Sequence, residues 1–226
     1  MIRFRQGQIS CGKIKWKKTW VYVRLIDSTD NLDEQENKTG EKKMRYHNIT
    51  KDDMLNGEGL RTVLWVAGCS HNCPGCHNPV TWDVRGGLPF DCAAKEELFA
   101  ELEKDYISGV TFSGGDPLHP VNREDIARLA EEIRGRYPNK TIWLYTGYDW
   151  EQVCGLALFK YIDVAVDGEF IEAYKDSGLH WKGSSNQRVI DVQRSLLMGE
   201  AVLYEEPLHQ IGENAGNRRK TDRNRE

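Results

Sequence analysis

Short apolar runs recur along the chain from residue 61 onward, and several of them end in glycine. The run TVLWVAG at 62–68 is apolar almost throughout, which is typical of a parallel strand buried on both faces. Other short runs along the chain are expected to form strands as well. The expected strands lie at residues 62–68, 109–115, 141–147, 161–168 and 186–192.

Amphipathic segments separate these runs. Residues 95–104 are expected to form a helix, and a second helix is expected to begin after Asn122 as its N-cap and to end at Gly135 and Pro138. The apolar face of the second helix consists of Ile126, Leu129, Ala130 and Ile133. Strands that alternate with helices in this way predict right-handed crossovers and a parallel sheet, either open or curled into a barrel.

The segments that follow three of the expected strands are rich in glycine and polar residues. In parallel α/β folds, ligands bind at the carboxyl ends of the strands, because these ends lie at one edge of the sheet. We therefore expect the loops at 68–78, 113–118 and 146–149 to share one pocket.

Both ends of the chain differ in composition from the middle. Residues 1–43 contain material for one strand, followed by the polar residues 29–43, which are expected to form a flexible linker. We expect either an N-terminal extension or a coding start at Met44, followed by one folded domain over 44–204. The basic segment 205–226 has no apolar face and is expected to be a disordered tail.

The overall composition is that of an ordinary globular protein. Apolar residues make up 39% of the chain and charged residues 29%, with a net charge of -4. This charge does not favour nucleic-acid binding. No apolar run approaches the roughly 20 residues of a membrane helix, and the basic start lacks the apolar core of a secretory signal. We therefore expect a cytoplasmic protein that binds neither nucleic acid nor membrane.

Three cysteines, Cys69, Cys73 and Cys76, lie in the short stretch GCSHNCPGCHN. In a reducing compartment such a group indicates a metal site or redox centre. Three thiolates are one short of the usual set for a 4Fe-4S cluster and would leave one iron open to another ligand. A zinc site completed by His71 or His77 is the alternative, whereas three buried cysteines would disagree with the turn-forming residues here. The remaining cysteines are scattered and are expected to be isolated structural thiols: Cys11, Cys92 and Cys154.

The segment SGGDP at 113–117 follows the second expected strand. Glycines at the end of a strand expose backbone groups to a ligand, and Asp116 adds a carboxylate that could bind an ammonium group. The alternative is that Asp116 caps a short helix or lies in its first turn. The sequence leaves both interpretations open.

Together these segments resemble the radical S-adenosylmethionine (radical SAM) enzymes, and among them the activating proteins of anaerobic ribonucleoside-triphosphate reductase. The resemblance is carried by NGEGLRTVLWVAGCSHNCPGCHNPVTW, VTFSGGDPL, IWLYTGY, DVAVDGEFIE and WKGSSNQRVIDV. It covers residues 44–192 and does not extend to 1–43 or to the basic tail. Two positions depart from the pattern: His77 replaces the usual tyrosine, and Asp116 stands where many members of the superfamily have glutamate.

The resemblance implies a fold, two cofactors and their ligands. The fold is an α/β, partial, open (β/α)6 barrel of the radical SAM type. Cys69, Cys73 and Cys76 are implied to hold three irons of a 4Fe-4S cluster, with S-adenosylmethionine on the fourth. The residues implied to bind or border S-adenosylmethionine are Gly75, Gly114, Gly115, Asp116, Tyr145, Thr146 and Gly147.

The resemblance also implies a reaction. An electron from reduced flavodoxin or a similar donor would pass through the cluster and cleave S-adenosylmethionine to methionine and a 5′-deoxyadenosyl radical. That radical would take an α-hydrogen from one glycine of anaerobic ribonucleoside-triphosphate reductase. A glycine suits this role because its backbone can enter a narrow site and its α-carbon is accessible.

Three other functions remain open at this point. The protein could activate a different glycyl radical enzyme, such as pyruvate formate-lyase. It could be a radical SAM enzyme for a small molecule, such as 7-carboxy-7-deazaguanine synthase. A zinc-stabilised binding module without catalysis is the alternative from a different class.

Overall fold

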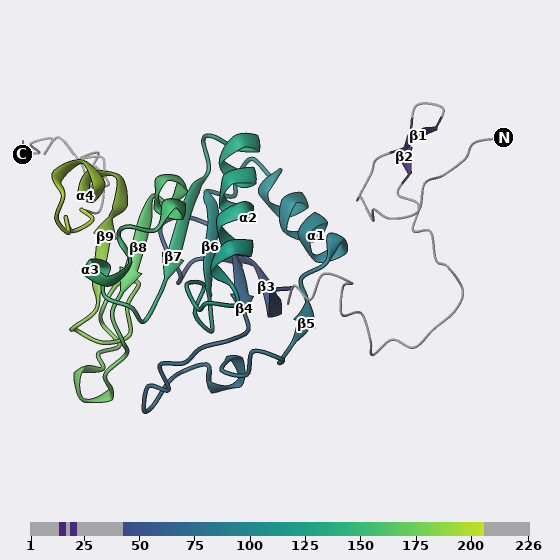
Figure 1. The fold of residues 1–226 in the computed structure, drawn as a ribbon. Coiled ribbons are helices and arrows are strands. Elements are labelled where there is room, and N and C mark those ends of the chain that lie inside the picture. The colour runs from purple at the N-terminus through teal and green to yellow at the C-terminus, as the bar shows by residue number, and fades with distance from the viewer. Residues whose placement is uncertain (1–13, 17–18, 22–42, 206–226) are drawn as a thin grey trace, which may run out of the picture.

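The computed structural model describes residues 14–16, 19–21 and 43–205 of the chain. Its centre is a mixed sheet with the strand order β5-β3-β4-β6-β7-β8-β9 (Figure 1). The strands of this sheet are β3 (Arg45–Asp53), β4 (Arg61–Val66), β5 (Leu88–Pro89), β6 (Gly109–Gly114), β7 (Thr141–Tyr145), β8 (Val164–Asp167) and β9 (Arg188–Asp191). The helices are α1 (Cys92–Leu102), α2 (Arg123–Arg136), α3 (Trp150–Val153) and α4 (Val192–Met198), with short 3-10 helices η1 (Pro79–Thr81), η2 (Ala157–Tyr161) and η3 (Glu172–Tyr174).

The middle of the sheet consists of four parallel strands, β4, β6, β7 and β8. Helix α1 connects β4 to β6, α2 connects β6 to β7, and α3 with η2 connects β7 to β8. Each of the predicted strands overlaps one of the observed strands, and the two predicted helices correspond to α1 and α2. The α/β class and the parallel centre are therefore confirmed.

The open barrel of six parallel β/α units is not confirmed, because the strands on both sides of the parallel centre are antiparallel to it. Strand β9 pairs antiparallel with β8, with Ala165 opposite Ile190. The connection over 168–187 contains only a single turn of 3-10 helix, so the chain turns back at the edge where β8 ended. On the other side, β3 pairs antiparallel with β4.

Strand β3 is not predicted by the sequence. Its residues, RYHNITKDD, are mostly polar, and Ile49 is its one buried side chain. A strand with so few apolar positions gives no period-2 signal. The structure nevertheless pairs β3 with both β4 and β5, and the indole N–H of Trp65 donates to Thr50 Oγ1 at 2.7 Å.

The start of α2 corrects one detail of the prediction. Asn122 is the N-cap residue by position, but its side chain makes no capping hydrogen bond. Its amide instead donates to the carbonyl oxygens of Ala67 at 2.9 Å and Asp116 at 3.0 Å. The helix also passes Gly135 and ends at Arg136. Asn122 thus joins the ends of β4 and β6 rather than closing the helix.

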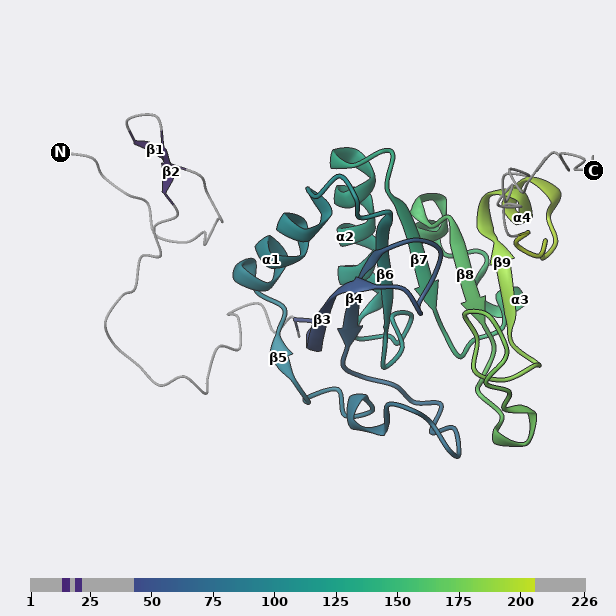
Figure 2. The ribbon, with the colours of Figure 1, turned by 180° about the vertical axis from the view of Figure 1, so that it is seen from behind.

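Helices α1 and α2 lie on one face of the sheet, in front of it in Figure 1 and behind it in Figure 2. Leu64, Phe112 and Leu144 of the sheet are buried in the core formed on this face. Each fully buried side chain of this kind stabilises the fold by about 1.5–3 kcal/mol. A second cluster contains Trp143 and Val166, whose neighbours in β7 and β8 belong to the first core, so it lies on the opposite face.

Arg61, the first residue of β4, is a fully buried cation on that second face. Its guanidinium donates to Thr111 Oγ1 at 2.8 Å, to the Val110 carbonyl at 2.7 Å and to Thr141 Oγ1 at 2.8 Å. It also lies 5.2 Å from the ring centroid of Trp143. Arg61 therefore links β4, β6 and β7 by side-chain contacts in addition to the strand pairing.

The predictions for the two ends of the chain fall mostly outside the described residues. Within the N-terminal segment, β1 (Ile14–Trp16) and β2 (Thr19–Val21) form an antiparallel pair, so two short strands replace the one expected. The predicted linker lies outside the described residues except for Lys43. The predicted tail lies outside them from residue 206 onward.

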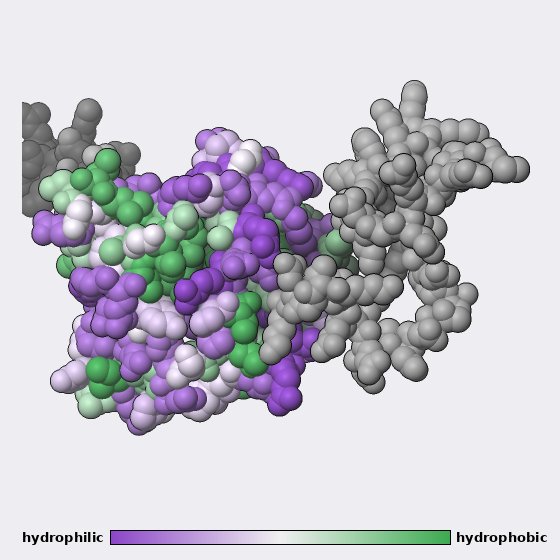
Figure 3. Space-filling view, in the orientation of Figure 1, coloured by the Kyte–Doolittle hydropathy of each residue, from purple (hydrophilic) through white to green (hydrophobic). Residues whose placement is uncertain are grey.

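The surface of the described residues includes exposed apolar side chains on α4. Leu197 is 86% exposed and Met198 is 68% exposed. Figure 3 shows hydrophobic surface at this end of the molecule. Within residues 14–16, 19–21 and 43–205, no helix combines the length and hydrophobicity needed to cross a membrane.

Arg61→Ala should lower the free energy of unfolding by about 3 kcal/mol, because it leaves buried carbonyl and hydroxyl groups of β6 and β7 without their donor. Chemical denaturation under anaerobic conditions measures this difference. The matched control is Arg85→Ala, whose side chain is 89% exposed, and which should change the free energy of unfolding by less than about 0.5 kcal/mol. A loss below about 1 kcal/mol for Arg61→Ala would contradict a structural role for this cation.

Candidate functional site

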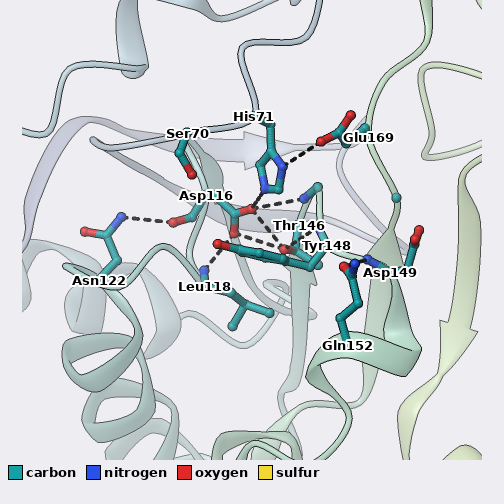
Figure 4. Close-up of polar contacts among 12 residues, drawn as sticks. Ser70, His71, Asp116, Leu118, Asn122, Thr146, Tyr148, Asp149, Gln152 and Glu169 are labelled. Atoms are coloured by element: carbon teal, nitrogen blue, oxygen red, sulfur yellow. Dashed lines mark hydrogen bonds and ion pairs between the residues drawn. The ribbon is translucent and has the colours of Figure 1, made fainter.

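Three loops meet at the carboxyl ends of β4, β6 and β7, and the side chain of Asp116 lies at the centre of their junction (Figure 4). One is the cysteine loop, which we define as residues 68–78; the others are 113–118 and 146–149. The contacts confirm that these loops come together at one edge of the sheet, whereas a pocket shared by them stays a prediction. Parallel strands place their carboxyl ends at one edge of the sheet, and this arrangement brings the loops together.

The carboxylate of Asp116 is 1% exposed and accepts hydrogen bonds from each loop. The backbone N–H of Leu118 donates to Oδ1 at 2.7 Å, which is the turn-forming contact expected of an aspartate at this position. The hydroxyl of Thr146 lies 3.0 Å from both oxygens, and the N–H of Gly147 donates to Oδ2 at 3.1 Å. Nε2 of His71 lies 2.7 Å from Oδ2.

The two glycines before Asp116 allow close approach between backbones. The N–H of Gly115 donates to the Val66 carbonyl at 2.8 Å, and the N–H of Asp116 donates to the Gly68 carbonyl at 2.7 Å. A Cβ on Gly115 would lie 2.5 Å from the Gly68 oxygen. Gly114 has a φ of +107° and would meet the Val66 backbone at 2.6 Å. Only glycines allow the loops after β4 and β6 to approach this closely.

His71 is a site residue whose role the sequence did not predict. Its Nδ1 lies 3.0 Å from Glu169 Oε1, so the ring bridges two carboxylates. Its ring packs edge-on against Tyr148, with centroids 4.7 Å apart, and a Cβ on Gly147 would lie 2.6 Å from it. The hydrogen bond to Asp116, and then that to Glu169, raise the pKa of His71. From the sequence, this histidine is a candidate only as a zinc ligand.

The cysteine loop holds Cys69, Cys73 and Cys76 between β4 and η1, and all three are free thiols of intermediate exposure. Burial raises the pKa of the Cys69 thiol to about 11, and it raises the pKa of Cys73. Backbone N–H groups of His71 and Phe170 act in the opposite direction on these two sulfurs. The N–H of Asn78 donates to Cys76 Sγ at 3.4 Å.

The structure does not bring these three thiols together as a preformed metal site. Among the described residues, no group of three histidine, cysteine or acidic side chains is arranged to hold a metal ion. Both ring nitrogens of His71 face carboxylates, so His71 is not oriented as a zinc ligand either. Metal ligands commonly come together only on binding. Three free thiols on one loop fit an iron-sulfur cluster as its ligands, and the backbone N–H groups directed at their sulfurs would donate hydrogen bonds to those ligands.

A second segment, residues 168–172, packs against the cysteine loop from the β8 side. Glu169 bonds to His71, and the ring of Phe170 lies 5.5 Å from that of His77. A Cβ on Gly75, whose φ is +73°, would lie 2.8 Å from the carboxyl carbon of Glu172. The left-handed conformation of Gly75 thus favours glycine at this position, and His77 has an aromatic neighbour.

Tyr145 is separated from the Asp116 junction, although it directly precedes Thr146. It packs with Trp143 on the sheet face opposite the helices. Burial raises the pKa of Tyr145. The charge of Arg61 lowers this pKa, and the charge of Asp53 raises it. The hydroxyl of Tyr145 is buried and has no hydrogen-bond partner among the described residues. Of the predicted S-adenosylmethionine residues, Thr146, Gly147 and Asp116 are in mutual contact, whereas the Tyr145 side chain lies apart.

The remaining thiols and the cavity at β9 also lie apart from the junction. Cys92 is the first residue of α1 and is exposed, and Cys154 follows α3. A cavity of about 420 Å³ is lined by Trp181, Tyr204 and other residues of 180–204. None of the predicted site residues lines it. Cys11 lies outside the described residues.

Comparison with known proteins relates this arrangement to iron-sulfur proteins. Residues 55–190 match the family model described as a 4Fe-4S single cluster domain. The chain is 45% identical over 146 residues to the anaerobic ribonucleoside-triphosphate reductase-activating protein of Enterobacteria phage T4, which covers 65% of this chain and 93% of the relative. It is 43% identical over 150 residues to the protein of the same name from Escherichia coli K12, and this match covers 65% of this chain and 97% of the relative. It is 40% identical over 148 residues to the protein of the same name from Vibrio cholerae, and this match covers 64% of this chain and 96% of the relative.

Gly115→Ala should disrupt the junction, because its Cβ would lie 2.5 Å from the Gly68 oxygen and 2.8 Å from the Gly68 carbonyl carbon. Backbone cannot move aside cheaply, and we expect a loss of about 2–3 kcal/mol in the free energy of unfolding. The matched control is Gly135→Ala in α2, where nothing lies within 4 Å of the new Cβ. That change should stabilise the protein by about 0.5–1 kcal/mol. Equal effects of the two substitutions in chemical denaturation would refute the close approach of the loops.

Proposed function

Because the chain belongs to the family of anaerobic ribonucleoside-triphosphate reductase-activating proteins, we propose that it activates such a reductase by generating a radical on one of its glycine residues. The observation that carries this proposal is the cysteine loop with three free thiols, joined to the Gly114–Asp116 loop within a match to a 4Fe-4S domain. When bound, a 4Fe-4S cluster and S-adenosylmethionine would supply the reductive cleavage that yields methionine and a 5′-deoxyadenosyl radical.

In this proposal the cysteine loop provides the iron ligands. Cys69, Cys73 and Cys76 would hold the cluster, and a set of three thiolates would leave one iron open to S-adenosylmethionine. Gly75 keeps the loop in its left-handed turn and leaves room for Glu172. Backbone N–H groups directed at the sulfurs favour the thiolate form that binds iron.

The Asp116 junction provides the binding groups for S-adenosylmethionine. Gly114 and Gly115 expose backbone beside the cysteine loop, and Asp116 supplies the negative charge that favours an ammonium group. Thr146 and Gly147 border the adenosyl half, and Tyr145, with its unpaired hydroxyl, lies beyond them on β7. The part of the fold that we assign to the radical SAM type is the parallel centre, which consists of β4, β6, β7 and β8.

The protein substrate that we assign is the anaerobic ribonucleoside-triphosphate reductase, and the electron donor is a reduced flavodoxin or a similar protein. The names of the relatives support this assignment over pyruvate formate-lyase or a small-molecule substrate. We place the protein in the cytoplasm, where both partners of the reaction would be found. A zinc module without catalysis is disfavoured by the match to a 4Fe-4S domain and by the orientation of His71.

Cys69→Ala, Cys73→Ala and Cys76→Ala should each abolish both cluster binding and S-adenosylmethionine cleavage, because two thiolates cannot hold a cluster with one defined open iron. Iron and sulfide analysis after anaerobic reconstitution, followed by assay of methionine release, measures both effects. Cys92→Ala and Cys154→Ala are the matched controls and should retain full iron. Cleavage at the wild-type rate in any of the first three variants would exclude the proposed ligands, and zinc without sulfide in the wild-type protein would exclude the cluster.

Asp116→Ala should retain iron and weaken S-adenosylmethionine binding about tenfold or more, because a sheltered bond between carboxylate and ammonium is worth roughly 1.5–3 kcal/mol. The structure adds a loss of stability, since the donors of Leu118 and Gly147 lose their acceptor. Isothermal titration of the reconstituted protein measures the affinity. Asp83→Ala, whose side chain is 61% exposed, serves as control. Unchanged affinity would limit Asp116 to the loop contacts seen here.

A further inference from the structure

The carboxylate of Asp116 has no place for an additional donor. An ionised carboxylate offers about four acceptor positions. The described residues fill them with the N–H groups of Leu118 and Gly147, the hydroxyl of Thr146 and the ring of His71. The carboxylate is also 1% exposed. An ammonium group can therefore bind Asp116 only if one of these donors leaves.

Three of the four donors are fixed in place. The N–H of Leu118 belongs to the turn that Asp116 itself begins, and the N–H of Gly147 directly follows β7 in the chain. Thr146 is 6% exposed, and its hydroxyl oxygen also accepts the N–H of Tyr148 at 3.2 Å. Removing any of these from Asp116 would require a change in the backbone or in a buried side chain.

The fourth donor, His71, is held differently. It reaches Asp116 by its side chain from the middle of the cysteine loop. The backbone N–H of His71 is directed at the Cys69 sulfur within the same loop. The backbone hydrogen bonds of Cys69 with Trp82 and of Cys76 with Cys73 lie on either side of it. The opposite nitrogen of its ring already contacts Glu169, whose side chain is 56% exposed. His71 can thus leave Asp116 and keep a partner.

The contact that His71 makes is chemically the same as the one expected of a ligand amine. In both cases a nitrogen that carries hydrogen, and that can carry positive charge, donates to a carboxylate oxygen at about 2.7–2.9 Å. A buried carboxylate that loses such a donor without replacement is destabilised. A protein side chain that fills the place before the ligand binds would keep Asp116 paired in both states.

We propose that His71, through its Nε2 contact with Asp116, occupies the place that the function proposed above assigns to the ligand ammonium, and that the ammonium displaces His71 on binding. This inference rests on the proposed function, because it takes S-adenosylmethionine as the ligand. His71 is then a competitor for this place and lowers the apparent affinity for the ligand. Glu169 contacts the opposite nitrogen of the ring and can remain its partner when the bond to Asp116 is broken.

The first test is the dissociation constant of S-adenosylmethionine, measured by isothermal titration with the full chain after anaerobic reconstitution. His71→Ala should bind at least threefold more tightly than the wild-type protein, because no bond to Asp116 has to be broken. His180→Ala, a histidine outside the junction, should bind as the wild-type protein does. If His71→Ala does not fold or does not retain iron, His71→Leu replaces it, since leucine keeps most of the side-chain volume without a ring nitrogen.

The second test is a double-mutant cycle with Asp116→Ala, which shows whether His71 acts on the affinity through its bond to Asp116. His71→Ala should tighten binding at least threefold in the wild-type background and clearly less in the Asp116→Ala background. Equal effects in both backgrounds, or weaker binding by His71→Ala, would overturn the proposal and leave the proposed function in place. If neither the wild-type protein nor His71→Ala, both folded and loaded with iron, binds S-adenosylmethionine, the proposed function fails and this inference fails with it.

Discussion

The buried carboxylate of Asp116 is the interaction on which the arrangement of this site depends. It is 1% exposed and accepts hydrogen bonds from donors in the cysteine loop, in its own turn and in the loop after β7. Because a buried charge without partners is strongly destabilising, the carboxylate needs a donor at each of these positions, and in this structure the donors hold the loops that carry them in a fixed relation. The position of the cysteine loop relative to the glycine loop follows from this requirement.

The sheet supplies the conditions for that contact. Four parallel strands bring three loops to one edge, and close backbone approach at Gly115 and Gly68 sets the distance between two of them. Arg61 ties the opposite ends of the same strands together through buried donors. Strand β9 is antiparallel to β8, and the segment between these strands packs against the cysteine loop, where Glu169 contacts His71. The site thus draws on the parallel centre and on the antiparallel edge of the sheet.

Much of this arrangement could be predicted from the sequence, and the exceptions have physical causes. Buried strands such as 62–68 are apolar throughout and are readily recognised, and their parallel order implies that the loops at their ends meet. Strand β3 is mostly polar and gives no pattern. The antiparallel direction of β9 could not be predicted, because an apolar run indicates a buried strand but not its orientation in the sheet. The contact of His71 with Glu169 joins residues 98 positions apart, and no local pattern indicates it.

The most direct test of the proposed activity is electron paramagnetic resonance of the target reductase. The reconstituted protein, a reducing system and S-adenosylmethionine are mixed anaerobically with an anaerobic ribonucleoside-triphosphate reductase. We predict a glycyl radical signal on the reductase that requires all of these components. The function would be contradicted if the protein cleaved S-adenosylmethionine but left the reductase without a radical under conditions in which the Escherichia coli relative activates the reductase.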